Sequence, residues 1–214
     1  MTQFRRLFGF LCCAAMACAQ TAPIRRGSFE VGGFAGATYG VSQAAPMGGG
    51  NISYAVTKMF LPYVEYSYFP NIQRQASGSI GSTTNTFSSA SYSTNASDFH
   101  VGVHLRFPIR ESRLAPYGAF GVGSLTVGSF TIQTLTYSDA NGTHSIPGPF
   151  HVSGISNAAI NFGGGIRYYT TPRFGLRLEV KGYKPFNGQD LGLGSVHFNN
   201  PFLKAEAGFF FQFK

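Results

Sequence analysis

Apolar and polar residues alternate along several segments of this chain, and this period of two constrains its fold more than any other feature. In DFHVGVHLRF, residues 98–107, every second residue from Phe99 to Phe107 is apolar, whereas His100 and His104 lie between them. Successive side chains of a β-strand point to opposite faces, so the pattern predicts a strand with one apolar and one polar face. About 9–11 such residues are enough to cross a bilayer at a tilt.

Eight segments are interpreted as strands in this way. They span residues 28–42, 49–58, 61–72, 97–108, 114–127, 155–170, 173–184 and 202–213. Short connections at 59–60, 109–113 and 171–172 alternate with longer ones at 43–48, 73–96, 128–154 and 185–201. Alternate connections of an up-and-down barrel lie at the same end, and short turns at one end with long loops at the other are typical of outer-membrane barrels. We therefore expect an all-β fold, an eight-stranded antiparallel up-and-down transmembrane β-barrel.

The expected long loops are polar. Residues 77–97 consist almost entirely of Ser, Thr, Asn, Gly and Ala, so we expect little fixed structure there, with a hairpin extension as the alternative. The Asn-Gly pair in SDANGTH, residues 138–144, is a hairpin-turn signal. The third long loop is therefore expected to be partly an extension of the strands.

The composition agrees with an apolar outer surface. Only 11% of the residues are charged, while the chain has 28 Gly, 22 Phe, 11 Tyr and no Trp. Soluble domains carry about 25% charged residues. After the N-terminal segment, no apolar run reaches the length of about 18 residues that a membrane-spanning helix needs. A soluble lipocalin-like barrel, the alternative fold, would need an apolar interior and a polar exterior.

The N-terminus is typical of a secretory signal. Arg5 and Arg6 precede the short apolar segment LFGFLCCAAMA, and Ala17 and Ala19 form an A-x-A cleavage site. The alternatives are a buried N-terminal helix and a lipoprotein acylated at Cys18.

The predicted domain organisation follows from this site. We expect a signal peptide at 1–19 and an outer-membrane β-barrel domain at 20–214, in the outer membrane of a Gram-negative bacterium. All three cysteines lie in the signal, so the exported chain would have no disulfide. Export and the lack of a basic run exclude nucleic acid as a partner.

The polar strand faces are expected to line the barrel interior, because a bilayer offers no partners to charged groups. By alternation, the inward-facing set is Glu30, Glu65, His100, His104, Arg106, Arg167, Arg177, Glu179, Lys181, Lys204 and Glu206. Its acids and bases are nearly balanced, and an eight-stranded interior is wide enough for side chains alone. We interpret the set as a salt-bridged plug; a narrow gated pore and a catalytic site are the alternatives.

No pattern indicates a metal, cofactor or catalytic site. His100 and His104 share a strand face but lie about 13 Å apart, too far for one ion. Ser195 and His197 are neighbours in a long loop, and no acid can be identified to complete a triad. We therefore expect no cofactor and no enzyme activity.

Basic residues gather at the short turns and the chain ends. They are Arg25, Arg26, Lys58, Arg110, Arg113, Arg173 and Lys214. The long loops and their edges carry chiefly Arg74 and Lys184. We interpret the basic rim as facing anionic lipid headgroups, with ordinary turn solubility as the alternative.

Three stretches resemble a known family. GGGIRYYTTPRFGLRLEVKGY, residues 163–183, resembles the penultimate hairpin of small bacterial outer-membrane barrels, and 61–69 and 115–123 resemble their third and fifth strands. The chain thus resembles the outer-membrane protein A-like and opacity-protein-like superfamily. The resemblance implies an eight-stranded barrel assembled by the outer-membrane insertion machinery, and members include structural proteins, adhesins and, rarely, enzymes or small pores. Because Trp is absent, the aromatic girdles are assigned to Tyr68, Phe107, Tyr117, Tyr168 and Phe174.

The C-terminus fits the insertion signal of that family. Glu206, Gly208, Phe211 and Phe213 have its spacing, and Lys214 is a departure because it follows the final phenylalanine. The leading functional expectation is a monomeric barrel with a structural or adhesin-like role, whose loops contact a host or environmental surface. A narrow channel for ions or small solutes is the alternative, followed by a lipid-modifying enzyme.

Overall fold

The computed structural model describes residues 24–39, 44–80, 85–110, 112–139, 142–186, 189–190, 195–196 and 201–214. Within these ranges, no helix has the length and apolar character needed to span a membrane. The predicted signal peptide with Ala17, Cys18 and Ala19 lies outside the described residues, as does His197.

Twelve strands occur in the described part of the chain. They are β1 (Phe29–Tyr39), β2 (Ala45–Tyr54), β3 (Phe60–Ile80), β4 (Asn85–Arg106), β5 (Leu114–Val127), β6 (Phe130–Asp139), β7 (Gly142–Val152), β8 (Ile155–Tyr169), β9 (Phe174–Pro185), β10 (Gln189–Asp190), β11 (Ser195–Val196) and β12 (Phe202–Phe213).

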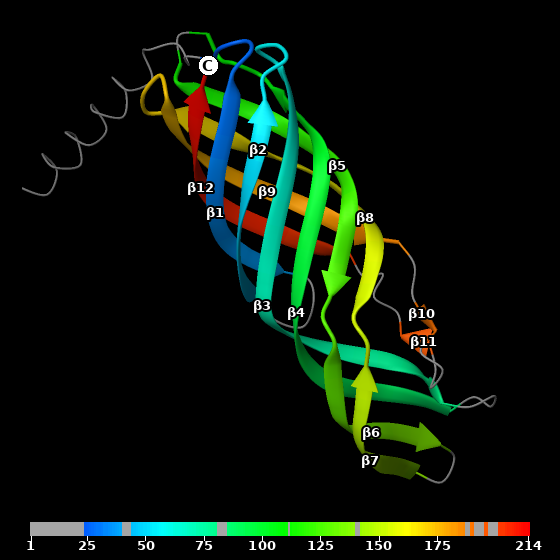
Figure 1. Ribbon diagram of the computed structural model, residues 1–214. Helices are drawn as coiled ribbons and strands as arrows, with labels where there is room; N and C mark the ends of the chain where they lie inside the picture. Colours follow the sequence, from blue (N-terminus) through cyan, green and yellow to red (C-terminus); the bar gives the residue numbers. More distant parts are fainter. Residues whose placement is uncertain are drawn as a thin grey trace, which may run out of the picture.

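Eight of these strands close into an antiparallel barrel (Figure 1). They follow one another in the order β3-β2-β1-β12-β9-β8-β5-β4, and pairing of β4 with β3 completes the circle. The first and last strands pair in register from Phe29↔Phe213 to Tyr39↔Leu203, so the chain ends meet in one ladder. The predicted all-β, eight-stranded antiparallel barrel is confirmed.

One end of the barrel, called here the turn end, carries the short connections 55–59, 107–113 and 170–173 together with the C-terminus (Figure 1). Two of these turns have the same construction. Thr57 Oγ1 accepts hydrogen bonds from the amides of Met59 and Phe60, and Thr171 Oγ1 accepts them from Arg173 and Phe174. A threonine hydroxyl satisfies the turn amides in this way, which stops the strand and reverses the chain.

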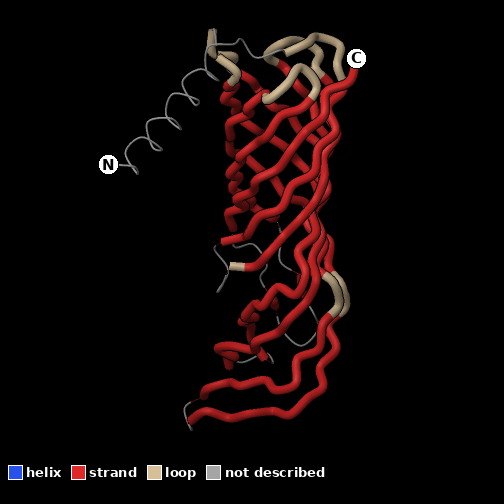
Figure 2. Tube along the Cα trace, turned by 90° about the vertical axis from the view of Figure 1, so that its left-hand side faces the viewer, coloured by secondary structure: helices blue, strands red, loops and turns tan. Residues whose placement is uncertain are grey.

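At the opposite end, called the loop end, hairpins extend well past the barrel (Figure 2). Strands β3 and β4 continue through the Ser/Thr-rich segment to Ile80 and from Asn85. For the described residues of 77–97, the expectation of little fixed structure is wrong and the alternative of a hairpin extension is confirmed. The hairpin expected from the Asn-Gly signal is confirmed as β6 and β7. The serine-rich segment has no strong apolar pattern, but its backbone forms ladder hydrogen bonds between β3 and β4, and these stabilise it as a hairpin.

The second strand is displaced from its predicted span of 49–58. It occupies Ala45–Tyr54, so the predicted long loop at 43–48 is wrong for residues 45–48. The glycines at 48–50 favour a loop in a prediction from sequence, but in the structure they pair with β1 on one side and β3 on the other. Gly49 leaves room for the Phe34 ring, since a Cβ at this position would lie 2.6 Å from Phe34 Cζ.

The outward and inward faces of the barrel strands differ sharply in the exposure of their side chains. Large apolar side chains cover the outside, with Phe162 60% and Leu178 63% exposed, whereas Lys181 is 0% exposed inside the barrel. Tyr117 is wrongly assigned to the aromatic girdle, because β5 turns this side chain inward and leaves it 4% exposed. Ala115 and Ala119 of β5 are buried on the same face as Tyr117.

Candidate functional site

The barrel interior contains a set of charged side chains with equal numbers of each sign. The described residues place five acids and five Lys or Arg inside, with two histidines, all at most 5% exposed. They are Glu30, Glu65, Asp98, Glu179 and Glu206; Arg106, Arg167, Arg177, Lys181 and Lys204; and His100 and His104. Cross-strand pairs such as Glu206↔Glu179 put like charges side by side, so cations must lie between the acids to offset their repulsion.

Glu30 is the centre of the group nearest the turn end. Arg106 Nη1 donates to Glu30 Oε1 at 2.6 Å and to Tyr169 Oη at 3.0 Å, and Arg167 Nη1 donates to the other Glu30 oxygen. Arg167 also lies over the ring of Phe210, with Cζ 5.0 Å from the centroid. The carboxylate of β1 is thus shared by guanidinium groups from β4 and β8, which ties three strands together across the interior.

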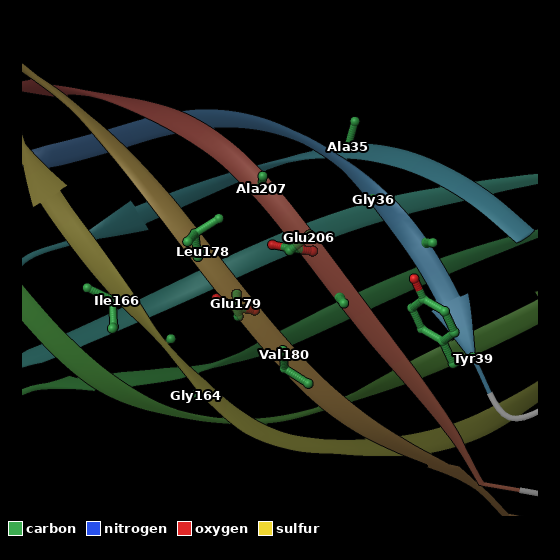
Figure 3. Close-up of a pocket in the computed structure, with 13 residues that line it drawn as sticks. Ala35, Gly36, Tyr39, Gly164, Ile166, Leu178, Glu179, Val180, Glu206 and Ala207 are labelled. Carbon is green, nitrogen blue, oxygen red and sulfur yellow. The ribbon is translucent and has the colours of Figure 1, made fainter. Parts of the chain in front are cut away.

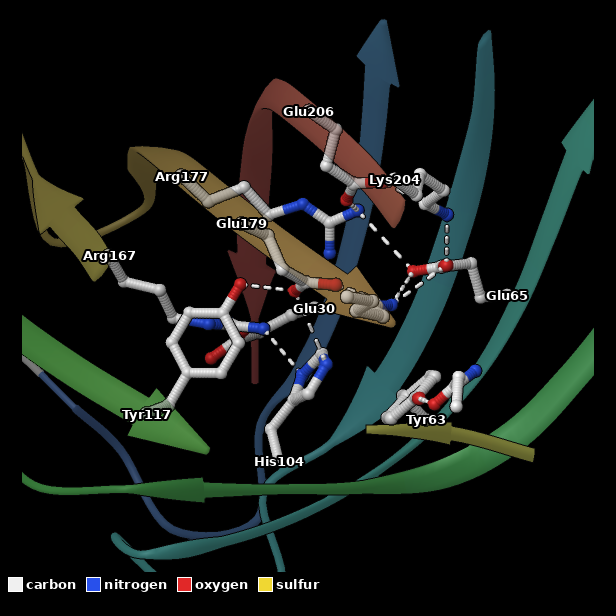
Figure 4. A network of polar contacts seen from close by, with 12 residues as sticks. Glu30, Tyr63, Glu65, His104, Tyr117, Arg167, Arg177, Glu179, Lys204 and Glu206 are labelled. Atoms are coloured by element: carbon white, nitrogen blue, oxygen red, sulfur yellow. Dashed lines mark hydrogen bonds and ion pairs between the residues drawn. The ribbon is translucent and has the colours of Figure 1, made fainter. Parts of the chain in front are cut away.

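Glu65 is the centre of the group in the middle of the barrel (Figure 4). Lys181 Nζ donates to both of its oxygens at 2.8 and 2.9 Å, and Lys204 Nζ donates to Oε1 at 2.6 Å. Arg177 lies 3.6 Å from Glu65 Oε2 and donates to Glu206 Oε1 at 2.7 Å. Lys204 bridges to Glu206 Oε2 at 3.0 Å, which closes a ring of alternating charges.

Glu179 joins the two groups (Figure 4). Its carboxylate accepts a hydrogen bond from Tyr117 Oη, forms an ion pair with Lys181 and lies 3.6 Å from His104 Nε2. The guanidinium of Arg167 can only donate, so His104 Nδ1, which is 3.0 Å from Arg167 Nη2, must accept. The ring hydrogen of a neutral His104 therefore lies on Nε2 and faces Glu179.

Asp98 is an interior residue that the sequence reasoning missed. It is fully buried, its carboxylate contacts His100 Nδ1, and it lies opposite Ser67 in the β3–β4 ladder. Its position two residues before His100 in the same alternating segment would have been enough to find it. The two histidines do not share a site, because His100 pairs with Asp98 and packs against Tyr183, whereas His104 contacts Arg167 and Tyr63.

Apolar layers lie above and below the charged groups. Toward the turn end, the layer consists of Ile24, Ala115, Tyr169 and Phe210. Toward the loop end, it consists of Phe34, Met47, Phe69, Ala96, Leu125, Val127, Ala159, Tyr183 and Phe202. Apart from Phe34, which lies in the middle of β1 beneath Arg177 and Lys204, these residues lie toward the ends of the strands within the barrel. Packed apolar side chains therefore separate the charged middle from both ends of the barrel.

Three of the acids come close enough to suggest a metal site. One carboxylate oxygen each from Glu65, Glu179 and Glu206 lies within 4.8 Å of the others. Lys181 and Lys204, however, already bridge these carboxylates. Two ammonium groups among three carboxylates supply the positive charge that a cation would bring, so the cluster is an ion-pair network in its own right.

The residues of the C-terminal motif divide between the two faces of β12. Glu206 and Gly208 are on the inward face, with Glu206 5% exposed, and Phe211 and Phe213 are exposed on the outside. The Phe211 ring packs against Phe174 of β9 at a centroid distance of 5.0 Å. The apolar end of the chain is therefore part of the outer surface of the barrel.

The outer surface carries a shallow hollow of about 600 Å³ over β1, β8, β9 and β12 (Figure 3). Small residues form its floor, including Ala35, Ala37, Ala207 and Gly164, and Leu178 stands at its side. Glu179 and Glu206 border it only through their strand segments, because both carboxylates are buried on the inward face. The hollow belongs to the apolar surface.

Comparison with known proteins agrees with this architecture. The model of the family "Outer membrane protein beta-barrel domain" matches residues 7–207. No curated protein matches the sequence. Among solved structures, Neisserial surface protein A is 13% identical with a TM-score of 0.55, over 88% of this chain and 100% of that one. A major outer membrane protein from Thermus thermophilus is 12% identical with the same coverage and TM-score.

The similarity also extends to an enzyme. The outer membrane protease OmpT from Escherichia coli is 10% identical with a TM-score of 0.52, over 87% of this chain and 97% of that one. At such identities the structural matches establish the fold alone. The family model covers nearly the whole chain, and the closed barrel has an apolar exterior and a charged interior. The chain therefore belongs to the outer membrane protein beta-barrel domain family and is a small barrel of the Gram-negative outer membrane.

Proposed function

We propose that this protein is a monomeric outer-membrane barrel whose extracellular hairpins contact another cell or material in the surroundings, in the manner of an adhesin. The observation that carries the proposal is the sheet beyond the barrel. The β3–β4 and β6–β7 hairpins join there through the pairs Thr86↔Ser138 and Phe87↔Tyr137. A hydrogen-bonded sheet presents a defined surface to a partner, at lower entropic cost than separate flexible loops.

The extension is also anchored to the barrel. Asn71 has a positive φ of 52° where the β3–β4 register shifts, and its amide donates to Asn95 Oδ1 at 2.9 Å. Thr94 Oγ1 donates to the carbonyl of Gly128 at 3.0 Å, which links β4 to the start of the second hairpin. Such bulges redirect a strand at the rim of a barrel, so the hairpins project at a set angle.

The interior gives less support to the alternative of a narrow channel. In the described part of the chain, the charged groups pair with one another between two apolar layers. Each buried glutamate has at least one ion pair with Lys or Arg, and Asp98 contacts His100. This arrangement also supports a role without catalysis or a cofactor. Reproducible, salt-dependent conductance steps in planar bilayers would favour the channel instead, and altered lipid A after incubation with the purified barrel would favour the enzyme.

The biogenesis that accompanies this role is part of the proposal. Cleavage after Ala19 releases the signal peptide, and the outer-membrane insertion machinery reads the C-terminal strand. The alternating phenylalanines of that strand, Phe211 and Phe213, lie on its exposed face, where they are accessible before the barrel closes. Mass analysis of the exported chain tests the cleavage site, since a start at Gln20 is expected.

The adhesin-like role is tested by surface display in a non-adherent Gram-negative host. Attachment to cultured cells and to abiotic surfaces is measured for the intact chain and for two variants, one with the 72–93 hairpin and one with the 130–152 hairpin replaced by a short turn. Val122→Ile, a conservative change on the lipid face, is the matched control. Attachment should fall in both hairpin variants while folded barrel persists in gels; attachment equal to that of the intact chain would contradict the role.

A further inference from the structure

The net charge of the barrel is confined to one end. From Ile24 onward the chain has fourteen Lys and Arg and eight Asp and Glu. Five of each are buried in the interior and cancel. By sequence, the strands and loops of the loop end carry Arg74, Lys184, Asp139 and Asp190, so the formal charge of this end is zero as well.

The turn end carries the remaining charge. Its seven cations, called here the basic rim, are Arg25, Arg26, Lys58, Arg110, Arg113, Arg173 and Lys214. By sequence, Glu111 is the one acid in these connections. The whole formal excess of six positive charges in residues 24–214 therefore lies at this end.

The basic rim runs around the barrel without a large gap. The amide of Gly27 donates to the carbonyl of Ala55 at 2.7 Å, which brings the Arg25–Arg26 segment beside the turn that holds Lys58. On the other side, the amide of Gln212 donates to the carbonyl of Arg173 at 2.7 Å. Arg113 Nη1 donates to the carbonyl of Thr170 at 2.9 Å, which joins the third turn to the second.

The cations lie directly beside the apolar belt. Lys58 precedes exposed Met59 and Phe60, and Lys214 follows exposed Phe213. Aromatic side chains at the edge of a membrane-spanning surface lie at the depth of the lipid headgroups. The neighbouring ammonium and guanidinium groups therefore reach the headgroup phosphates, beyond the acyl chains.

Most of the rim is available to a ligand. Six of the seven cations are exposed and Arg113 is half-buried. Among the described residues, no acidic side chain forms an ion pair with Arg25, Arg26, Lys58, Arg173 or Lys214. The interior cations, in contrast, are all paired with buried acids, so they do not bind anions from outside the protein.

We infer that the basic rim is a binding surface for anionic phospholipid headgroups of the inner leaflet. Short turns of outer-membrane barrels face the periplasm, so this end meets the phospholipid leaflet. The ring of cations at headgroup depth selects phosphatidylglycerol over zwitterionic lipid. A Lys or Arg near an anionic surface strengthens association about fivefold. The surface is independent of the adhesin-like hairpins, which lie at the opposite end.

The test measures lipid selection by the reconstituted full-length barrel. The chain is placed in phosphatidylcholine vesicles with a trace of spin-labelled phosphatidylglycerol or spin-labelled phosphatidylcholine, and the immobilised fraction of each label is compared. Because one labelled headgroup contacts about one cation of the rim at a time, we expect about fivefold preference for phosphatidylglycerol. The preference should disappear in high salt, because exposed charges are then screened.

Two variants separate the basic rim from the rest of the protein. The rim variant combines Arg25→Gln, Arg26→Gln, Lys58→Gln, Arg173→Gln and Lys214→Gln and should show equal binding of the two lipids. The matched control combines Arg74→Gln and Lys184→Gln at the loop end and should keep the full preference. If the rim variant does not fold, Lys58→Gln with Arg173→Gln gives the same comparison and should at least halve the preference.

Several results would overturn the inference. Equal binding of both lipids by the intact chain would do so, as would unchanged preference in the folded rim variant. Loss of preference in the loop-end control would show that total charge matters and the basic rim does not. Co-sedimentation of the intact chain with purified peptidoglycan, without lipid selection, would assign the basic rim to a carboxylate-bearing polymer instead.

Discussion

Replacement of Glu65 by glutamine removes the negative charge that two buried lysines share, and so tests the interior network most directly. The side chain is 0% exposed and accepts hydrogen bonds from two lysines, at 2.8 and 2.9 Å from Lys181 and 2.6 Å from Lys204. With an effective dielectric constant of about 20, unit charges about 2.8 Å apart attract by about 6 kcal/mol before desolvation is subtracted. Removal of one partner of a buried pair costs about 3–5 kcal/mol, because the other charge stays buried.

Glu65→Gln should therefore lower the free energy of unfolding by about 5 kcal/mol, the upper end of that range, because two ammonium groups lose their counter-charge. The chain has no Trp. Denaturant unfolding from lipid vesicles is therefore followed by far-UV circular dichroism and by the migration of folded and unfolded barrel in gels. Tyr66→Phe, at the exposed neighbouring position, is the control and should change stability by no more than about 0.5 kcal/mol.

A second substitution tests the physical reason. Lys204→Met removes one of the cations stranded by Glu65→Gln, while Glu206 keeps its hydrogen bond from Arg177 at 2.7 Å. The double variant should be more stable than the sum of the single effects by about 2 kcal/mol. If Glu65→Gln stays within about 0.5 kcal/mol of the parent and the two changes are additive, the interior charges do not depend on one another as described.

Three further predictions concern the barrel wall and its assembly. Val101→Arg puts a charge on the lipid face of β4, opposite Val64 in the ladder, and should cost about 2–4 kcal/mol in the same assay, whereas Val101→Leu should be tolerated. Gly49→Leu would drive Cβ to 2.6 Å from the Phe34 ring and should cost at least about 1–3 kcal/mol, whereas Gly48→Ala meets nothing closer than 3.6 Å and should fold normally. Phe213→Ala should reduce the fraction of heat-modifiable, folded barrel in cells; an unchanged fraction would contradict an insertion role for the C-terminal strand.

The strand content, the two strand faces and the interior charge could be predicted from the sequence alone. Each follows from local alternation, since neighbouring side chains in any strand must point to opposite sides. The eleven predicted interior residues are all buried, and Asp98 could have joined them by the same rule. The C-terminal strand could also be predicted, because Phe209, Phe211 and Phe213 alternate with Glu206, Gly208 and Gln212. Phe210 is the exception among the phenylalanines, since it points inward.

Which weakly patterned segments become strands depends instead on the tertiary structure. Residues 45–48 offer only Ala45 and Met47 as an apolar face, beside Pro46 and Gly48. They are extended because β1 offers a complete ladder next to them. The serine-rich part of β3 and β4 is a hairpin for the same reason, as each strand supplies the partner of the other.

The ion-pair partners of the charged side chains could not be predicted from the sequence either. Glu30 and Arg167 are 137 residues apart, and Glu65 and Lys204 are 139 apart, so their contact depends on the order of strands around the barrel and on their stagger. Alternation assigns a side chain to a face, but the height at which it meets others inside is set by the register of every ladder between them. That register places the charges in the middle, with Tyr63 and Tyr117 among them, and the apolar layers toward the two ends.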